Sequence, residues 1–308
     1  MTAISIDRIS KSYDGIQALK SISFKVGDGE LFGLIGPDGA GKSTLFRILT
    51  TLLLPDEGEA TVAGHNIVND YKLIRKEVGY MPGKFSLYQD LSVEENLSFF
   101  ATIFGTTIEE NYDLIKDIYV QIEPFKKRLA GKLSGGMKQK LALCCALIHK
   151  PKVLFLDEPT TGVDAVSRKE FWEMLKSLVK KDISILVSTP YMDEASLCDR
   201  IALIQHGEIL SIDEPSAMIK GYPKHVYAVK SERFYELLEL LRTQDFTTSA
   251  LPFGDCLHLT TEAELDVEEV LQMISDKGYS NVEMAKILPT IEDIFLGLSD
   301  MQTESSHG

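Results

Sequence analysis

The sequence predicts an α/β protein in which a mostly parallel sheet carries helices on both faces and a small α+β domain follows. Between residues 31 and 212, short apolar runs typical of strands alternate with segments of helical periodicity. After Tyr222-Pro223 a second series of strand and helix patterns begins. With 308 residues, 44% hydrophobic and 25% charged, the chain can bury a sizeable core, which excludes overall disorder, a collagen-like repeat and a disulfide scaffold.

The elements of the first part follow from apolar spacing and turn residues. Alternating or β-rich segments predict strands, and apolar residues three and four apart predict helices. The turn at Pro55-Asp56-Glu57-Gly58 ends the first helix, and Ser134 is a suitable N-cap for a later one. The expected strands are residues 3–9, 22–26, 31–35, 59–63, 153–156 and 183–188, with a hairpin of 201–205 and 208–212 across His206-Gly207. The expected helices are residues 43–54, 134–149, 167–180 and 193–198, and a helical pattern covers 93–128.

The second part has strand and helix patterns in the order βαββαβ, which is the split arrangement of ferredoxin-like domains. Residues 223–308 carry six Lys and Arg against 16 Asp and Glu, so they hold −10 of the net charge of −14. We therefore expect domains at 1–222 and 223–300, and a polar, flexible tail at 301–308. The pattern places strands at 226–229, 246–250, 256–259 and 282–287, and helices at 234–241, 267–275 and 290–298.

Charge, cysteines and hydropathy argue against several classes of protein. The acidic balance argues against a chain that binds nucleic acid through a basic surface. Cys144, Cys145, Cys198 and Cys256 form no CxxC pair, so we expect buried free thiols of a cytosolic protein. Charged residues interrupt the N-terminus, which argues against a signal peptide. No run reaches 18 apolar residues, so we expect any membrane role to require a partner.

A glycine-rich loop lies between the strand at 31–35 and the helix that follows it. Residues 36–44 match the pattern G-x-x-x-x-G-K-[ST] between a strand and a helix, as a phosphate-binding loop requires. Its backbone N–H groups and the N-terminus of the helix can point at phosphate oxygens. Lys42 would reach the β- and γ-phosphates of a nucleotide, and the Ser43 hydroxyl would ligate Mg²⁺. The candidate binding residues are Gly36, Asp38, Gly39, Ala40, Gly41, Lys42, Ser43 and Thr44.

The apolar strand at 153–156 ends in two acids, Asp157 and Glu158. Carboxylates at the end of a buried strand are costly unless they are paired or used. With a phosphate loop upstream, Asp157 fits the partner of Mg²⁺, and Glu158 fits the group that polarises the attacking water. The alternative is that the two acids only cap the turn that follows the strand.

A third motif, Leu133-Ser134-Gly135-Gly136-Met137-Lys138-Gln139, stands just before a helix. With the phosphate loop and the strand that ends in Asp-Glu, in this order, residues 1–215 resemble the ATP-binding subunit of an ABC transporter. The resemblance implies a P-loop NTPase with a RecA-like core, a helical subdomain at about 84–150, and ATP and Mg²⁺ as ligands. It also implies a second ATP-binding subunit packed head to tail. Ser134, Gly135 and Gly136 would then contact the γ-phosphate held by the other subunit.

The resemblance assigns further roles and partners. Tyr13 matches the aromatic residue that stacks on adenine. Asp164 would bridge the two subunits and act with Lys42 and Glu158 in hydrolysis. The segment 85–97 resembles the subset of ABC ATPases that serve ABC-2-type exporters, and it would face an integral membrane permease. We therefore expect a peripheral protein at the cytoplasmic face of the cell membrane.

Two positions depart from the family's pattern. Gly83 stands where the family normally has Gln, and Pro190 stands where it normally has His. Glycine has no side chain to ligate Mg²⁺, and proline has neither a side-chain donor nor a backbone N–H. Because loss of a preorganised donor costs roughly a hundred-fold or more in rate, we expect slow hydrolysis. The hypotheses are the impaired half of a heterodimer, a homodimer with a slow but adequate ATPase, and a regulatory subunit that clamps ATP with negligible hydrolysis.

Overall fold

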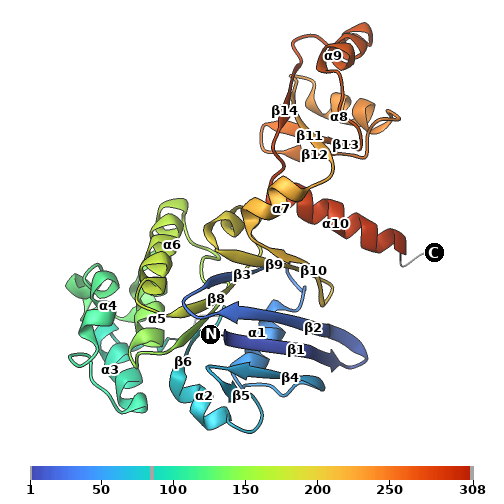
Figure 1. The fold of residues 1–308 in the computed structure, drawn as a ribbon. Coiled ribbons are helices and arrows are strands. Elements are labelled where there is room, and N and C mark those ends of the chain that lie inside the picture. The colour runs from blue at the N-terminus through green and yellow to red at the C-terminus, as the bar shows by residue number, and fades with distance from the viewer. Residues whose placement is uncertain (1, 84–86, 306–308) are drawn as a thin grey trace. The chain divides into compact units, whose positions relative to one another are not determined.

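The computed structural model of the chain describes residues 2–83 and 87–305, the last five as backbone only (Figure 1). Backbone contacts divide the chain into two compact units, Met1–Pro215 and Ser216–Gly308. This division falls before the expected boundary at 222, because the helix α7 (Pro215–Gly221) and Tyr222 group with the second unit. The Tyr222 hydroxyl donates to the carbonyl of Asp293, 3.5 Å away in that unit.

An antiparallel sheet in the first unit has the strand order β2-β1-β4-β5. Its first two strands form a hairpin whose turn, Asp14-Gly15, has φ angles of 46° and 85°. Two successive positive φ angles are typical of the type I′ turn that joins two-residue hairpins. The expected strands at 3–9 and 22–26 are therefore too short, and the Asp-Gly dipeptide is the signal that marks the true turn. The strands are β1 (Thr2–Tyr13), β2 (Ile16–Gly27), β4 (Glu57–Val62) and β5 (His65–Asn66).

A six-stranded sheet in the same unit has the order β10-β9-β3-β8-β7-β6. All neighbours are parallel except β10, which pairs antiparallel with β9 across the expected turn at His206-Gly207. Every residue of β3, β7 and β8 is buried, as in parallel sheets covered on both faces. The prediction of a mostly parallel sheet is thus confirmed. Its strands are β3 (Leu31–Ile35), β6 (Val78–Met81), β7 (Val153–Asp157), β8 (Ser184–Thr189), β9 (Arg200–Gln205) and β10 (Glu208–Asp213).

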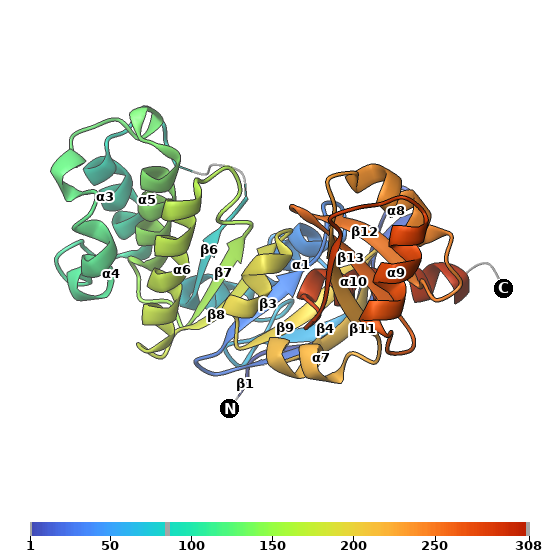
Figure 2. The ribbon, with the colours of Figure 1, turned by 90° about the horizontal axis from the view of Figure 1, so that it is seen from above.

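Helices cover this sheet. Helix α1 packs on β7 and also on β2 and β4, while α6 packs on β3 and β8. Helices α3, α4 and α5 lie together, with α5 against β6 (Figure 2). None of the described helices is both long and apolar enough to span a membrane. The helices are α1 (Lys42–Leu49), α2 (Tyr71–Glu77), α3 (Val93–Phe104), α4 (Tyr112–Tyr119), α5 (Gly135–Leu147) and α6 (Ala165–Val179), with 3₁₀ turns at Glu123–Phe125, Ala130–Lys132 and Met192–Leu197.

Two helical predictions need correction. The first helix ends at Leu49 and not at 54, because Thr51 has a φ of 63° and the Leu52 N–H donates back to the Arg47 carbonyl at 2.8 Å. The helical pattern at 93–128 divides into α3, α4 and a 3₁₀ turn, because Gly105 ends α3 in a left-handed conformation. The Ser134 N-cap of α5 is confirmed, since its hydroxyl accepts a hydrogen bond from the Met137 N–H at 3.3 Å.

The second unit contains an antiparallel sheet of order β12-β13-β11-β14 with two helices between its strands along the chain, the split βαβ arrangement that the sequence predicts. The second strand begins at Ser249 and not at 246, because the Thr247 hydroxyl donates to the Leu241 carbonyl and closes a turn there. The last helix continues to Ser305, into the tail expected at 301, and residues 306–308 lie outside the described part. The elements are β11 (His225–Lys230), α8 (Phe234–Arg242), β12 (Ser249–Phe253), β13 (Cys256–Thr261), α9 (Val267–Asp276), β14 (Glu283–Ile287) and α10 (Ile291–Ser305).

Candidate nucleotide site

The loop between β3 and α1 has the backbone form of an anion-binding loop. Gly39 and Gly41 have φ angles of 79° and 104°, which residues with a Cβ rarely adopt. A Cβ at Gly41 would lie 2.5 Å from the Ala18 carbonyl oxygen. A Cβ at Gly36 would lie 2.1 Å from the Ile204 carbonyl oxygen. The loop is therefore held against neighbouring backbone, and its N–H groups lead into the N-terminus of α1.

Lys42 is buried at the centre of this loop, with 3% of its surface exposed. Its ammonium group donates to the carbonyls of Gly36 and Pro37 at 2.8 and 2.9 Å. It also lies 3.2 Å from Oε1 of Glu158, the residue that follows β7. A single cation thus connects the loop after β3 with the acid after β7, although β8 lies between these two strands in the sheet.

Asp157 and Glu158 are both held by Ser188, near the end of β8. The Ser188 hydroxyl donates to Oδ1 of Asp157 at 2.7 Å, and Asp157 is 4% exposed. The Glu158 N–H donates to the carbonyl and the hydroxyl oxygen of Ser188, at 3.1 and 3.0 Å. Burial, reinforced by the nearby Asp157 carboxylate, raises the pKa of Tyr80 to about 12. The Tyr80 phenol therefore stays neutral beside this acidic strand end at physiological pH.

The remaining residues of the phosphate loop differ in exposure. Asp38 and Gly39 are exposed at its tip, whereas Ala40 is buried. Ser43 and Thr44 are half-buried in the first turn of α1. The hydroxyl of Ser43 and the carboxylate of Asp157 are the hard oxygen donors that Mg²⁺ prefers. The donor set at this end of the sheet therefore fits Mg²⁺.

Tyr13 stands at the end of β1, next to the hairpin turn, with 41% of its surface exposed. The ammonium group of Lys11 lies 5.9 Å from the centre of its ring. The following strand, β2, runs beside the phosphate loop, because Ala18 lies against Gly41. An exposed ring on this hairpin is available to stack on a base.

The segment Ser134-Gly135-Gly136 begins α5 and lies against the loop that begins α6. A Cβ at Gly136 would lie 2.6 Å from the Ser167 hydroxyl, and one at Gly135 would lie 3.5 Å from the Gly162 carbonyl. In the described structure, these contacts of the two glycines are with the first turn of α6 and the loop before it, and not with the phosphate loop of the same chain. The structure thus brings Lys42, Asp157 and Glu158 together. It places the segment Ser134-Gly135-Gly136 against the loop before α6.

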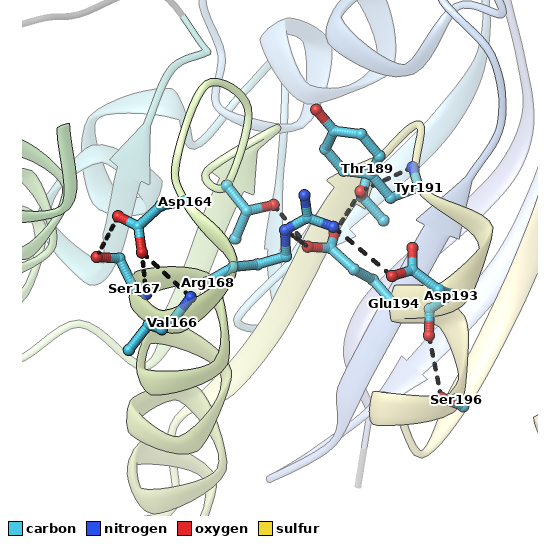
Figure 3. Close-up of polar contacts among 10 residues, drawn as sticks. Asp164, Val166, Ser167, Arg168, Thr189, Tyr191, Asp193, Glu194 and Ser196 are labelled. Carbon is cyan, nitrogen blue, oxygen red and sulfur yellow. Dashed lines mark hydrogen bonds and ion pairs between the residues drawn. The ribbon is translucent and has the colours of Figure 1, made fainter.

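Asp164 caps α6 from the end of this loop. Its carboxylate accepts from the N–H groups of Val166 and Ser167, at 3.1 and 3.0 Å, and from the Ser167 hydroxyl at 2.8 Å (Figure 3). The hydrogen bonds from Ser167 lower the pKa of the exposed Asp164. The carboxylate therefore remains ionised at neutral pH and holds the start of the helix.

Both departures from the family pattern border this site. A Cβ at Gly83 would lie 3.0 Å from the carbonyl oxygen of Asp157 and 3.9 Å from its Oδ2. Pro190 directly follows Thr189, whose carbonyl accepts from the Gly36 N–H at 3.2 Å. A side chain at position 83 would therefore contact Asp157, and position 190 follows a residue that is bonded to the phosphate loop.

Sequence reasoning did not single out Ser188, Thr160 or Glu194. Ser188 holds both acids, and Glu194 accepts from Thr160 in the loop after them. The only signal in the sequence for Ser188 is a small polar residue at the end of an apolar strand. Nothing in the sequence distinguishes Glu194 from Asp193, the exposed acid beside it.

The fold and this loop define a nucleotide-binding protein of the P-loop class. Residues 19–161 match the ABC transporter family. The chain is 36% identical over 301 residues to the probable multidrug ABC transporter ATP-binding protein YbhF of Escherichia coli, covering 96% of this chain. It spans about half of that relative, 52% of its length. It is 34% identical over 309 residues to the Nod factor export ATP-binding protein I of a Rhizobium species (strain N33), covering 98% of both chains.

The chain therefore belongs to the family of ABC transporter ATP-binding proteins. Among solved structures it resembles a dimeric post-hydrolysis state of the ATP-binding cassette MJ0796 bound to ADP and Pi. The TM-score is 0.62 and the identity 25%, covering 68% of this chain and 98% of that one. The predicted resemblance and the P-loop NTPase fold of the first unit are thus confirmed.

Proposed function

We propose that the chain is an ATP-binding and ATP-hydrolysing subunit of an exporter, acting on a separate membrane subunit. The observation that carries this proposal is the contact between Lys42 and Glu158 beside Asp157, where the ends of β3, β8 and β7 meet. Parallel α/β sheets bind ligands at this end of their strands. The export names of the two relatives support the transport role.

Different residues of the site bind the phosphates, Mg²⁺ and the base of ATP. The N–H groups of loop 36–41 and the ammonium group of Lys42 bind the β- and γ-phosphates of ATP. The hydroxyl of Ser43 and the carboxylate of Asp157 would hold Mg²⁺, which supplies positive charge to the phosphates when bound. A triphosphate competes with Glu158 for Lys42 and so releases the Glu158 carboxylate toward solvent. Tyr13, an exposed aromatic residue, would stack on adenine.

Hydrolysis is an in-line displacement at the γ-phosphorus. Glu158 accepts a proton from water while the water oxygen bonds to phosphorus. The bond from phosphorus to the β–γ bridging oxygen breaks, and ADP leaves with that electron pair. The products are ADP and inorganic phosphate.

A second ATP-binding subunit would complete the site. Ser134 caps the N-terminus of α5, where backbone N–H groups and the helix dipole favour an anion. This segment contacts the loop before α6 and not the phosphate loop of its own chain. We therefore expect it to bind a phosphate group that another subunit holds. The dimeric arrangement named for the structural relative MJ0796 supports such a pairing. Asp164, in the same loop, would contact the opposite subunit.

A groove of about 800 Å³ supports docking of an integral membrane permease on the first unit. It lies between the core and the helical subdomain, and its wall from α3 is aromatic. An apolar groove of this kind accepts the apolar face of an amphipathic helix, and the two arginines at its core side suit an acidic end. Permease binding would hold the chain at the cytoplasmic face of the cell membrane. The groove is lined by Arg47, Arg75, Tyr88, Phe99, Phe100 and Ile103, among others.

We further propose that Gly83 and Pro190 lower the intrinsic rate of hydrolysis. Glu158, Asp157 and Lys42 are together, which supports hydrolysis rather than a clamp that only binds ATP. The two substitutions remove donors beside the site, which supports a low intrinsic rate. A heterodimer would then pair this site with a fully equipped one, whereas a homodimer would hydrolyse slowly at both sites.

ATP turnover by the full chain tests the proposed function. We expect measurable phosphate release from Mg-ATP, and we expect Glu158→Gln to abolish it while ATP still binds. Glu239→Gln, which changes an exposed acid in α8, should leave turnover unchanged. Tight ATP binding with no turnover by the wild-type chain would support the regulatory clamp instead, and absence of ATP binding would refute both.

A further inference from the structure

Glu194 is a buried carboxylate that the proposed mechanism does not use. It lies in the 3₁₀ turn after β8 and is 1% exposed. Its two oxygens accept hydrogen bonds from the hydroxyl of Thr160 at 2.8 Å and from the hydroxyl of Thr189 at 2.5 Å. The Nε of Arg168 lies 3.7 Å from Oε1 (Figure 3). The buried charge thus has two donors and a cation, as a carboxylate away from water requires.

These partners belong to three separate elements that meet around the site. Thr189 is the last residue of β8, Thr160 lies two residues after Glu158, and Arg168 is in the first turn of α6. Thr160 and Thr189 are almost fully buried. Glu194 therefore joins the end of a sheet strand, the loop that follows the catalytic acid, and the helix that this loop begins.

The Glu158 backbone needs such support. Its φ angle is 51°, in the left-handed region that residues with a Cβ rarely adopt. A conformation of this kind persists only where the surrounding structure fixes it. On one side, Ser188 accepts two hydrogen bonds from the Glu158 N–H. On the other side, the Glu158 carbonyl accepts from the Thr161 N–H at 3.3 Å, and the Thr160 hydroxyl in this turn donates to Glu194 at 2.8 Å.

We propose that Glu194 is a positioning residue for hydrolysis, which holds Glu158 in its left-handed conformation through Thr160 and keeps that loop joined to the end of β8 through Thr189. The proposal rests on the proposed function, because it takes Glu158 as the group that polarises water. Without the Thr160 anchor, the backbone of Glu158 can relax and its carboxylate moves relative to the γ-phosphate. A displacement of about 1 Å can lower a catalytic rate by about a hundred-fold.

The test compares Thr160→Val, which removes the hydroxyl at nearly constant volume, with Thr160→Ser, which keeps it. In the full chain we expect Thr160→Val to lower kcat for Mg-ATP by roughly ten- to a hundred-fold. The Kd for ATP should stay within about twofold, because the phosphate loop is unchanged. Thr160→Ser should restore kcat to within about threefold of wild type. A role in packing alone predicts instead that Val is tolerated as well as Ser.

Two further variants separate the possible failures. Thr261→Val removes a hydroxyl that is equally buried, in the second unit, where it donates to the Ala263 carbonyl, and it should leave kcat unchanged. Glu158→Gln reports on the proposed function itself. If Glu158→Gln abolishes turnover but Thr160→Val does not lower it, the positioning role is wrong and the proposed function stands. If the wild-type chain and Glu158→Gln are equally inactive, both proposals are refuted.

Discussion

Replacing Pro190 by histidine should raise the rate of ATP hydrolysis. Position 190 directly follows β8, whose last residue, Thr189, accepts a hydrogen bond from the Gly36 N–H of the phosphate loop at 3.2 Å. A side chain at position 190 therefore begins one residue after a backbone contact with the phosphate loop. One donor preorganised toward the developing charge is worth about a hundred-fold in rate, or about 2.7 kcal/mol of the barrier. No neighbouring side chain has been arranged to orient the new imidazole. We therefore expect the rate of ATP hydrolysis to rise by roughly ten- to a hundred-fold.

The assay is phosphate release by the full chain at saturating Mg-ATP, with the Kd for ATP measured in parallel. Pro190→Ala is the matched control, since it restores the backbone N–H and removes the ring without adding an imidazole. An increase with histidine that alanine does not reproduce assigns the effect to the side-chain donor. Equal rates for Pro190→His and Pro190→Ala, with ATP binding intact, would refute the reasoning and show that the missing donor does not limit hydrolysis.

Two further predictions concern groups with shifted pKa values. Hydrogen bonds from Ser167 lower the pKa of folded Asp164 below its ordinary value of 3.8, so its contribution to stability is present above the unfolded pKa and is lost as pH falls through the folded one. The urea midpoint of wild type should fall more steeply between pH 5 and pH 3 than that of Asp164→Asn, and parallel curves would contradict this. Burial raises the pKa of the thiols of Cys144, Cys145 and Cys198, so a thiol reagent at pH 8 should label them only after unfolding in urea. Rapid labelling of the native chain would show that these thiols are accessible.

The contiguous motifs could be predicted from sequence because each is a local structure. A phosphate loop needs glycine, lysine and serine at fixed spacing along one turn of chain, and residues 36–44 have that spacing in the structure. Short strand pairs were harder to predict. Residues 78–81 form β6 only because they pair with β7, more than 70 positions later, and no local pattern marks them.

Two other differences between the expected and the observed elements lie at local turns. The Asp14-Gly15 dipeptide marks a hairpin turn, and the strands on both sides extend to it. The first helix ends early because Thr51 adopts a left-handed φ of 63° and the N–H groups of Leu52 and Leu53 donate back to the Arg47 carbonyl, which closes the helix end. The residue at which a turn or a helix end falls depends on a few backbone angles and hydrogen bonds. Hydrophobic periodicity does not report these.

The amino-acid sequence by itself determined the class of protein, the phosphate loop and the two acids after a buried strand, because these are contiguous and their chemistry follows from residue type and spacing. Only the tertiary structure decided which residues surround Glu158. Ser188 and Glu194 lie at least 30 positions after Glu158 in the chain. Ser188 reaches the Glu158 N–H, and Glu194 reaches Thr160 in the loop that follows, because β8 pairs between β3 and β7. Strand order in a parallel sheet is set by packing of the whole core, so no local pattern along the chain contains it.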